Sequence, residues 1–203
     1  MDYDYEKIEL KQLIIENSLV VSEELITLSS GKQTHHYYDI KKAILDPKGV
    51  HLISTIMLEE IKQLAGGQPI GSVGGLEVGA IPIATAIILK ARSKNEGDIN
   101  SFYIRKKAKD HGLKRSIEGN PIEPIVIVDD VITGGDSILK AIDELTKAGK
   151  IMLGVVTVVD RGGGENLKKS GIKHRSVFKD EDFADVVKDK LSALKTGAKS
   201  AEV

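Results

Sequence analysis

One stretch of the sequence joins two acidic side chains to a glycine-rich loop. Asp129 and Asp130 directly follow the apolar run 125–128, and the loop 133–137 comes shortly afterwards. Glycines let backbone N–H groups approach an anion closely, and the N-terminus of a following helix adds partial positive charge. Carboxylates repel phosphate but accept hydrogen bonds from sugar hydroxyls. The pattern therefore predicts a site for a ligand that carries both a ribose diol and a 5′-phosphate.

A second charged stretch lies at residues 105–115, where six basic side chains and one acidic side chain give a local charge of +5 on a chain of net charge −1. Such a cluster neutralises a departing pyrophosphate, whose charge grows as its bond to carbon breaks. His111 is a candidate proton donor near neutral pH. A solvated basic loop or a modest nucleic-acid patch explains the charge alone equally well. The basic residues are Arg105, Lys106, Lys107, Lys109, Lys114 and Arg115.

Two further strand ends carry residues of interest. Gly74 and Gly75 follow an expected strand at 69–73, and in a turn their backbone amides can approach a diphosphate. A tight strand-to-helix turn is the structural alternative. Arg161 follows an expected strand at 152–159, and its planar guanidinium matches a carboxylate in a bidentate pair. An acidic ligand is therefore indicated at this position, with a surface ion pair to a neighbouring acid as the alternative.

These four stretches need a parallel sheet to bring them together. Strand-like runs alternate with helix-length amphipathic segments, which predicts an α/β fold with a three-layer parallel sheet. Ligands bind beyond the carboxyl ends of such strands, where all four stretches fall. The expected strands are 69–73, 101–105, 125–128, 152–159 and 173–178, with helices at 6–17, 47–64, 79–91 and 136–148 and a strand pair within 25–40.

Composition excludes several classes of protein. The chain has 203 residues, of which 41% are hydrophobic, so it can bury a core and is not globally disordered. It has no cysteine, which excludes disulfides, thiol nucleophiles and zinc–cysteine sites. Because 29 basic residues face 30 acidic residues, no nucleic-acid or membrane partner is expected. The acidic N-terminus lacks a secretory signal, and no apolar run is long enough to span a bilayer, so a cytoplasmic protein is expected.

The segment 128–135, VDDVITGG, resembles the signature of phosphoribosyltransferases that use phosphoribosyl pyrophosphate (PRPP). The resemblance implies that the two acidic residues hold the ribose 2′- and 3′-hydroxyls and that the following loop holds the 5′-phosphate. The residues implied in PRPP binding here are Asp129, Asp130, Val131, Ile132, Thr133, Gly134, Gly135, Asp136 and Ser137.

The segment 105–112, RKKAKDHG, looks like the basic lid of the orotate phosphoribosyltransferase family. That resemblance implies that Arg105, Lys106, Lys109 and His111 bind pyrophosphate. It makes Lys109 and His111 the catalytic residues, on a lid that reaches the neighbouring subunit of a homodimer. It also implies that Gly74 and Gly75 form the pyrophosphate loop.

The same family is indicated by two more segments. Residues 159–164, VDRGGG, resemble the context of its substrate arginine, which implies that Arg161 and Thr133 bind orotate. Residues 25–39 are similar to its hood over the base. Two lysines that many members carry are replaced by Ser29 and Val78 in this chain. The resemblance covers about residues 8–165. His35, His36, His51 and His174 show no metal-site spacing and are interpreted as ordinary surface or core residues.

The resemblance implies a type I phosphoribosyltransferase fold: a hood at 1–40, a core at 41–195 and a disordered tail at 196–203. It implies transfer of the phosphoribosyl group of PRPP to orotate, giving orotidine 5′-monophosphate and pyrophosphate in pyrimidine (UMP) biosynthesis. Mg²⁺ is the implied cofactor, with no direct protein ligand. The alternatives are transfer to another base and a non-catalytic regulator that senses a phosphoribosyl ligand. Lys109 and His111 favour an enzyme.

Overall fold

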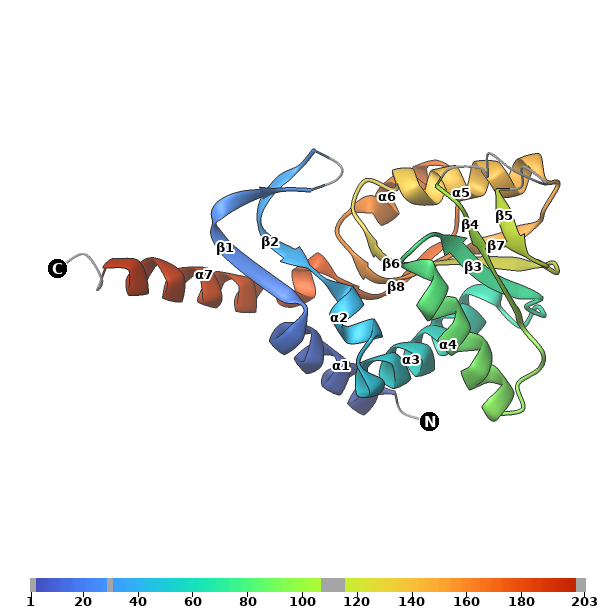
Figure 1. Ribbon diagram of the computed structural model, residues 1–203, viewed down its shortest axis with the longest axis horizontal. Coiled ribbons are helices and arrows are strands. Elements are labelled where there is room, and N and C mark those ends of the chain that lie inside the picture. Colours follow the sequence, from blue (N-terminus) through green and yellow to red (C-terminus); the bar gives the residue numbers. More distant parts are fainter. Residues whose placement is uncertain (1–2, 29–30, 107–115, 200–203) are drawn as a thin grey trace.

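The structure is a computed structural model that describes residues 3–28, 31–106 and 116–199. At its centre lies a six-stranded sheet with the order β5-β4-β3-β6-β7-β8 (Figure 1). Five strands run parallel, and the short edge strand β5 pairs antiparallel with β4. The expected α/β fold is confirmed, with β5 as an antiparallel addition. The strands are β3 (Ser72–Leu76), β4 (Asn100–Ile104), β5 (Ile117–Gly119), β6 (Ile125–Ile132), β7 (Met152–Asp160) and β8 (His174–Lys179).

Helices cover both faces of the sheet, which gives the three layers (Figure 1). One face carries the N-terminal helices and α4, and the other carries α5 and α6. Local signals set the boundaries of α3: the Asp46 side chain accepts a hydrogen bond from the Gly49 N–H at 2.8 Å, and Gly66 ends the helix with a φ of 59°. The helices are α1 (Asp4–Asn17), α2 (Ile40–Ile44), α3 (Pro47–Ala65), α4 (Ala80–Ser93), α5 (Asp136–Lys147) and α6 (Gly163–Lys169).

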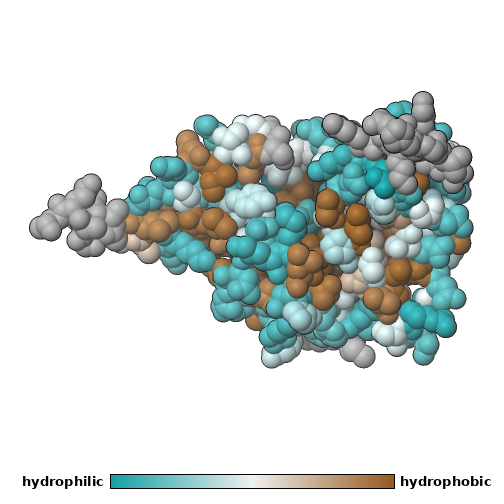
Figure 2. Space-filling model, viewed as in Figure 1, coloured by the Kyte–Doolittle hydropathy of each residue, from teal (hydrophilic) through white to brown (hydrophobic). Residues whose placement is uncertain are grey.

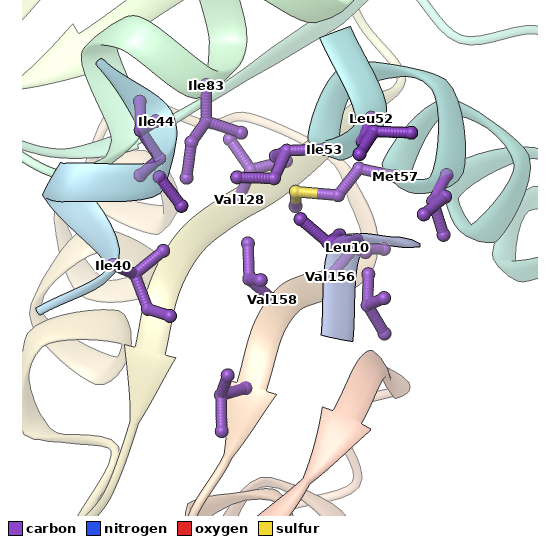
Figure 3. Close-up of a cluster of buried hydrophobic side chains, with 14 of the residues drawn as sticks. Leu10, Ile40, Ile44, Leu52, Ile53, Met57, Ile83, Val128, Val156 and Val158 are labelled. Atoms are coloured by element: carbon purple, nitrogen blue, oxygen red, sulfur yellow. The ribbon is translucent and has the colours of Figure 1, made fainter. Parts of the chain in front are cut away.

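The central strand β6 is apolar on both faces because each face meets a layer of helices. Val126 and Val128 pack into the core beneath α1, α3 and α4, whereas Ile125 and Ile127 pack toward α5. Figure 3 shows Val128 of β6 among side chains from neighbouring elements, including Met57. Each fully buried aliphatic side chain of this kind contributes about 1.5–3 kcal/mol. This burial fixes the strand whose carboxyl end carries the two acidic residues.

A hairpin and a C-terminal helix stand beside the sheet. Strands β1 (Leu19–Thr27) and β2 (Gln33–Tyr38) pair antiparallel. The 3₁₀ helix η1 (Asp180–Phe183) leads into α7 (Ala184–Lys199), which packs on β1 and projects from the body (Figure 1). Figure 2 shows hydrophobic residues along this projecting helix. Within the described residues, no helix has the length and apolarity to cross a membrane.

Residues 196–199 belong to α7, and the disordered tail expected at 196–203 stays a prediction. Residues 200–203 lie outside the described residues. The boundaries of the hood at 1–40 and of the core at 41–195 stay predictions.

Strand β3 also differs from the expectation, because it spans 72–76 instead of 69–73. Gly74 and Gly75 therefore lie buried inside the strand and not in the turn after it. A Cβ at Gly74 would lie 2.2 Å from the carbonyl oxygen of Phe102, and one at Gly75 would lie 2.3 Å from that of Val128. The two glycines let β3 pack closely between its neighbours. The expected turn at these two glycines was wrong, since the chain leaves the strand only at Glu77, and their proposed part in a pyrophosphate loop stays a prediction.

We expect Gly74→Val to destabilise the fold by more than about 3 kcal/mol, because the added side chain meets backbone atoms that cannot move aside. Urea unfolding followed by circular dichroism measures the effect. Gly97→Ala is the matched control: nothing lies within 4 Å of its Cβ position, and its φ of 103° leaves only a backbone cost of about 1–2 kcal/mol. Equal losses in the two variants would contradict the packing explanation.

Candidate active site

Two adjoining cavities open at the carboxyl end of the sheet. One of about 560 Å³ lies over the loop between β6 and α5, and one of about 760 Å³ lies between that loop and the hairpin β1–β2. Both are lined by Leu76, Lys106, Asp129, Val131, Thr133 and Ser137. Described residues from three of the stretches singled out in the sequence thus line this space: Lys106, the acidic pair with the loop after β6, and Arg161. They lie at the carboxyl edge of the parallel sheet.

The two acidic residues end strand β6 in a fixed geometry. The Asp130 N–H donates to Asp129 Oδ1 at 3.0 Å, and the Val131 N–H donates to Asp130 Oδ1 at 2.9 Å. Burial and the neighbouring Asp130 raise the pKa of Asp129 well above its usual range. A Cβ at Gly79 would lie 2.9 Å from Asp130 Oδ1, so the turn after β3 passes directly over the carboxylates. A carboxylate pair held this way presents its free oxygens to hydroxyl donors.

The loop after β6 leads into the N-terminus of α5. Gly135 precedes the helix with a φ of 93°, a conformation that glycine adopts without steric cost. The Asn166 side chain of α6 donates to the Gly134 carbonyl at 3.0 Å and anchors the loop. Thr133 and Ser137 line both cavities. The helix N-terminus and the two hydroxyls give this end of the cavity the character of an anion site.

The described part of the basic stretch lies at the same edge. Lys106 lines both cavities, and its backbone N–H donates to Glu77 Oε1 at 2.9 Å. Arg105 lines the smaller cavity, but its guanidinium pairs with Glu118 of β5 at 2.9 Å. Lys107, Lys109, His111, Lys114 and Arg115 lie outside the described residues, so the predicted roles of Lys109 and His111 stay predictions.

Arg161 lines the larger cavity together with Thr133, which is the arrangement predicted for a carboxylate-binding arginine. Its side chain is only 3% exposed. The guanidinium lies over the ring of Tyr38, with 5.2 Å from Cζ to the ring centroid. Asp180 contacts its Nε at 3.3 Å, and His36 contacts its Nη2 at 2.9 Å. Arg161 is thus held in the wall of the cavity rather than on the open surface.

Three residues around this cavity were missed in the sequence. His36, interpreted as an ordinary surface or core residue, contacts Arg161, and its place on the same strand face as Thr34 and Tyr38 was an available signal for that contact. Asp180 follows the carboxyl end of β8, a second usable signal. Lys41 also lines the larger cavity, and nothing in the sequence singled it out. His174 does fit the core interpretation, since burial lowers its pKa.

The comparisons with known proteins agree with this fold and site. The model of the phosphoribosyl transferase domain matches residues 41–189 of the chain. The chain therefore belongs to the phosphoribosyltransferase family, as the resemblance of its motifs had implied. Within that family, curated relatives from Aquifex aeolicus and Pyrococcus abyssi are named orotate phosphoribosyltransferase.

The relative from Aquifex aeolicus is 41% identical over 179 residues, which cover 86% of this chain and 95% of that protein. The relative from Pyrococcus abyssi is 40% identical, covering 82% of this chain and 89% of that protein. Among solved structures, the Mycobacterium tuberculosis orotate phosphoribosyltransferase in complex with PRPP has a TM-score of 0.67 at 29% identity, covering 88% of this chain and 91% of that one. The similarity therefore spans nearly the whole chain.

Proposed function

We propose that this protein is an orotate phosphoribosyltransferase, which converts orotate and PRPP to orotidine 5′-monophosphate and pyrophosphate in UMP biosynthesis. The observation that carries the proposal is the connected space lined by Asp129 and Asp130, by the loop before α5, and by the buried Arg161. A ribose diol, a 5′-phosphate and an acidic base each find a matching group there. The curated relatives carry the same name.

Each part of the site has a role in this reaction. Asp129 and Asp130 accept hydrogen bonds from the ribose hydroxyls, and the N-terminus of α5 with Ser137 holds the 5′-phosphate. Arg161 and Thr133 hold the orotate, so that its ring nitrogen N1 faces the anomeric carbon. As N1 bonds to the anomeric carbon and loses its proton, the bond to the pyrophosphate oxygen breaks through a state of oxocarbenium character, and the departing pyrophosphate takes up that proton. Positioning and electrostatic stabilisation supply the catalysis, with no covalent intermediate on the enzyme.

Magnesium belongs to the proposal, and the residues present fit it. Mg²⁺ keeps several waters and is commonly held by one or two carboxylates together with substrate phosphates. Asp129 and Asp130 offer such a pair, through water and the ribose hydroxyls. Among the described residues, no group of three or more His, Asp or Glu side chains forms a cage for the ion alone. When bound with PRPP, the ion neutralises charge on the diphosphate.

The same proposal covers the partners and the compartment. The basic lid, with Lys109 and His111, is expected to close over pyrophosphate in the neighbouring subunit of a homodimer, and the enzyme is expected in the cytoplasm. The likeness of the segment 105–112 to the family's lid supports the shared site.

A panel of bases tests the reaction. With PRPP and Mg²⁺ present, we expect orotate to release pyrophosphate and uracil, adenine and hypoxanthine to release little, because only orotate carries a carboxylate for Arg161. A coupled assay for pyrophosphate measures the rates. Release with another base but not with orotate would identify a different phosphoribosyltransferase, and release with none, together with tight binding of PRPP, would identify a regulator.

A further inference from the structure

The side chains behind Arg161 form a compact polar cluster drawn from three distant parts of the chain. Thr34, His36 and Tyr38 lie on β2, Arg161 follows β7, and Asp180 follows β8. Asp180 Oδ1 is the centre of the cluster. It lies 2.8 Å from His36 Nε2, 2.9 Å from the Tyr38 hydroxyl and 3.3 Å from Arg161 Nε. Three donors thus converge on one carboxylate oxygen.

This cluster keeps Asp180 ionised. Burial raises the pKa of Asp180, but the hydrogen bonds from His36 and Tyr38 and the charge of Arg161 outweigh it and lower the pKa to about 2. Burial and the same carboxylate raise the pKa of Tyr38, so its hydroxyl stays protonated and donates. At neutral pH Arg161 therefore faces a permanent negative charge on its Nε side.

His36 lies between the two charged groups, and its Nε2 cannot form a hydrogen bond with both of them. Its Nε2 lies 2.9 Å from Arg161 Nη2 and 2.8 Å from Asp180 Oδ1. A guanidinium only donates and a carboxylate only accepts, whereas one ring nitrogen either donates or accepts. One of the two short contacts is therefore not a hydrogen bond.

The other contacts of His36 indicate which of these two short contacts is the hydrogen bond. The Thr34 hydroxyl lies 3.2 Å from His36 Nδ1 and can donate to it, which leaves the proton on Nε2, facing Asp180. Nη2 of Arg161 then has only long contacts, at 3.4 Å to Thr34 Oγ1 and 3.3 Å to the His36 carbonyl. In the described part of the chain, no group accepts from Nη1. Nη1 of the guanidinium is thus under-used, its Nε is held by Asp180, and Arg161 as a residue lines the larger cavity.

We infer that Asp180, together with His36, positions Arg161 so that the outer edge of its guanidinium meets the carboxylate of the base. Asp180 and His36 touch the arginine and not the substrate, so both are positioning residues. They set the preference for an acidic base, because an arginine aimed away from the cavity loses its bidentate pair with the carboxylate. This inference rests on the proposed function, in which Arg161 binds orotate.

The test compares two product nucleotides that differ only in the carboxylate. We measure the Kd of orotidine 5′-monophosphate and of uridine 5′-monophosphate for the full chain by isothermal titration calorimetry. The wild type is expected to prefer the acidic nucleotide. Asp180→Asn is expected to reduce that preference about tenfold while changing the Kd of uridine 5′-monophosphate less than about twofold, because only the carboxylate contact depends on the arginine. In kinetics, the KM for orotate rises and the KM for PRPP stays constant.

A control variant and a second test variant accompany Asp180→Asn. Glu181→Gln removes the same charge one residue further on, where the side chain is 74% exposed, and is expected to behave as wild type. His36→Gln is a second positioning variant, with His35→Gln as its neighbour on the other strand face. Its expected result is the same loss of preference, so the inference remains testable even if Asp180→Asn unfolds.

The outcomes separate the inference from the proposed function. A wild type with no preference for the acidic nucleotide would overturn the proposed role of Arg161 and the inference with it. A wild-type preference that Asp180→Asn and His36→Gln leave intact would overturn the inference alone. Equal weakening of both nucleotides would also overturn it, because that result indicates a general structural role.

Discussion

Replacing Asp129 and Asp130 together by asparagine is expected to reduce kcat/KM about 10²–10⁴-fold, because each hydrogen bond from a ribose hydroxyl to a charged acceptor contributes about 1.5–3 kcal/mol. Asparagine keeps the shape and the carbonyl acceptor for the backbone N–H groups of Asp130 and Val131. The loss therefore measures charge rather than folding. Steady-state kinetics with saturating orotate and varied PRPP gives the value.

The same double variant is expected to be more stable than wild type without ligand. The pKa of Asp129 is raised in the folded state, so the folded chain keeps a proton that the unfolded chain releases. This group's contribution to stability then falls as the pH rises from the unfolded value through the raised folded value. Asparagine removes the buried charge, so its gain in Tm is expected to be larger at pH 8 than at pH 4. Differential scanning calorimetry at the two pH values measures it.

Asp98→Asn is the matched control for this pair of effects. Asp98 lies at the surface with its side chain 81% exposed, lines neither cavity, and pairs with Arg92. Surface ion pairs of this kind contribute about 0–1 kcal/mol, so neither turnover nor Tm should change appreciably. A double variant that loses activity and stability together would show that the two carboxylates support the fold instead of opposing it.

Lys109→Ala is expected to lower kcat about 10²–10³-fold, because it removes a cation that stabilises the growing charge on the departing pyrophosphate. Binding of orotidine 5′-monophosphate, which carries no pyrophosphate, should change less than about threefold. Stopped-flow measurement of a single turnover separates the chemical step from product release. Lys42→Ala is the control, since Lys42 is exposed on α2 and lines neither cavity. Unchanged turnover in the Lys109 variant would remove this lysine from the mechanism.

Mixing the Lys109→Ala variant with the Asp129→Asn/Asp130→Asn variant tests whether the lid of one subunit acts in the site of the other. A dimer of one Lys109→Ala chain and one Asp129→Asn/Asp130→Asn chain has one intact site if each lid serves the partner. Random reassortment should then restore about a quarter of the wild-type activity, as expected for a symmetric dimer. If each lid serves its own site, no exchange of subunits can restore activity.

The sequence predicted the parts of the molecule whose signal is local. The run 125–128 is apolar without interruption because helices cover both faces of β6, and the acidic pair and glycine loop follow it directly in the chain. Arg161 was found for the same reason, as a cation at the end of a strand. Strand β3 was placed three residues early because Gly74 and Gly75 are typical of a turn, and only the neighbouring strands show why they belong to the sheet.

Contacts between distant segments carry no such signal. His36 and Asp180 are 144 residues apart, and neither belongs to a motif, so no spacing could bring them together. Lys41 lines the cavity because α2 begins where the hairpin ends, which depends on the packing of α2 against α3. The short elements β5 and α6 have too few residues for a period to be recognised. Sequence therefore located the groups proposed to bind the substrate but missed the groups that hold them.

The distance along the chain between β2 and Asp180 bears on how the protein matures on the ribosome. Tyr38 is synthesised 142 residues before the carboxylate that its hydroxyl contacts. At about 5–20 residues per second, the hairpin waits roughly 7–30 s for that partner to be made. The wall around Arg161 is therefore among the last parts to be completed. A chain shortened before residue 180 would lack that partner for Arg161, even though its acidic pair and phosphate loop were already made.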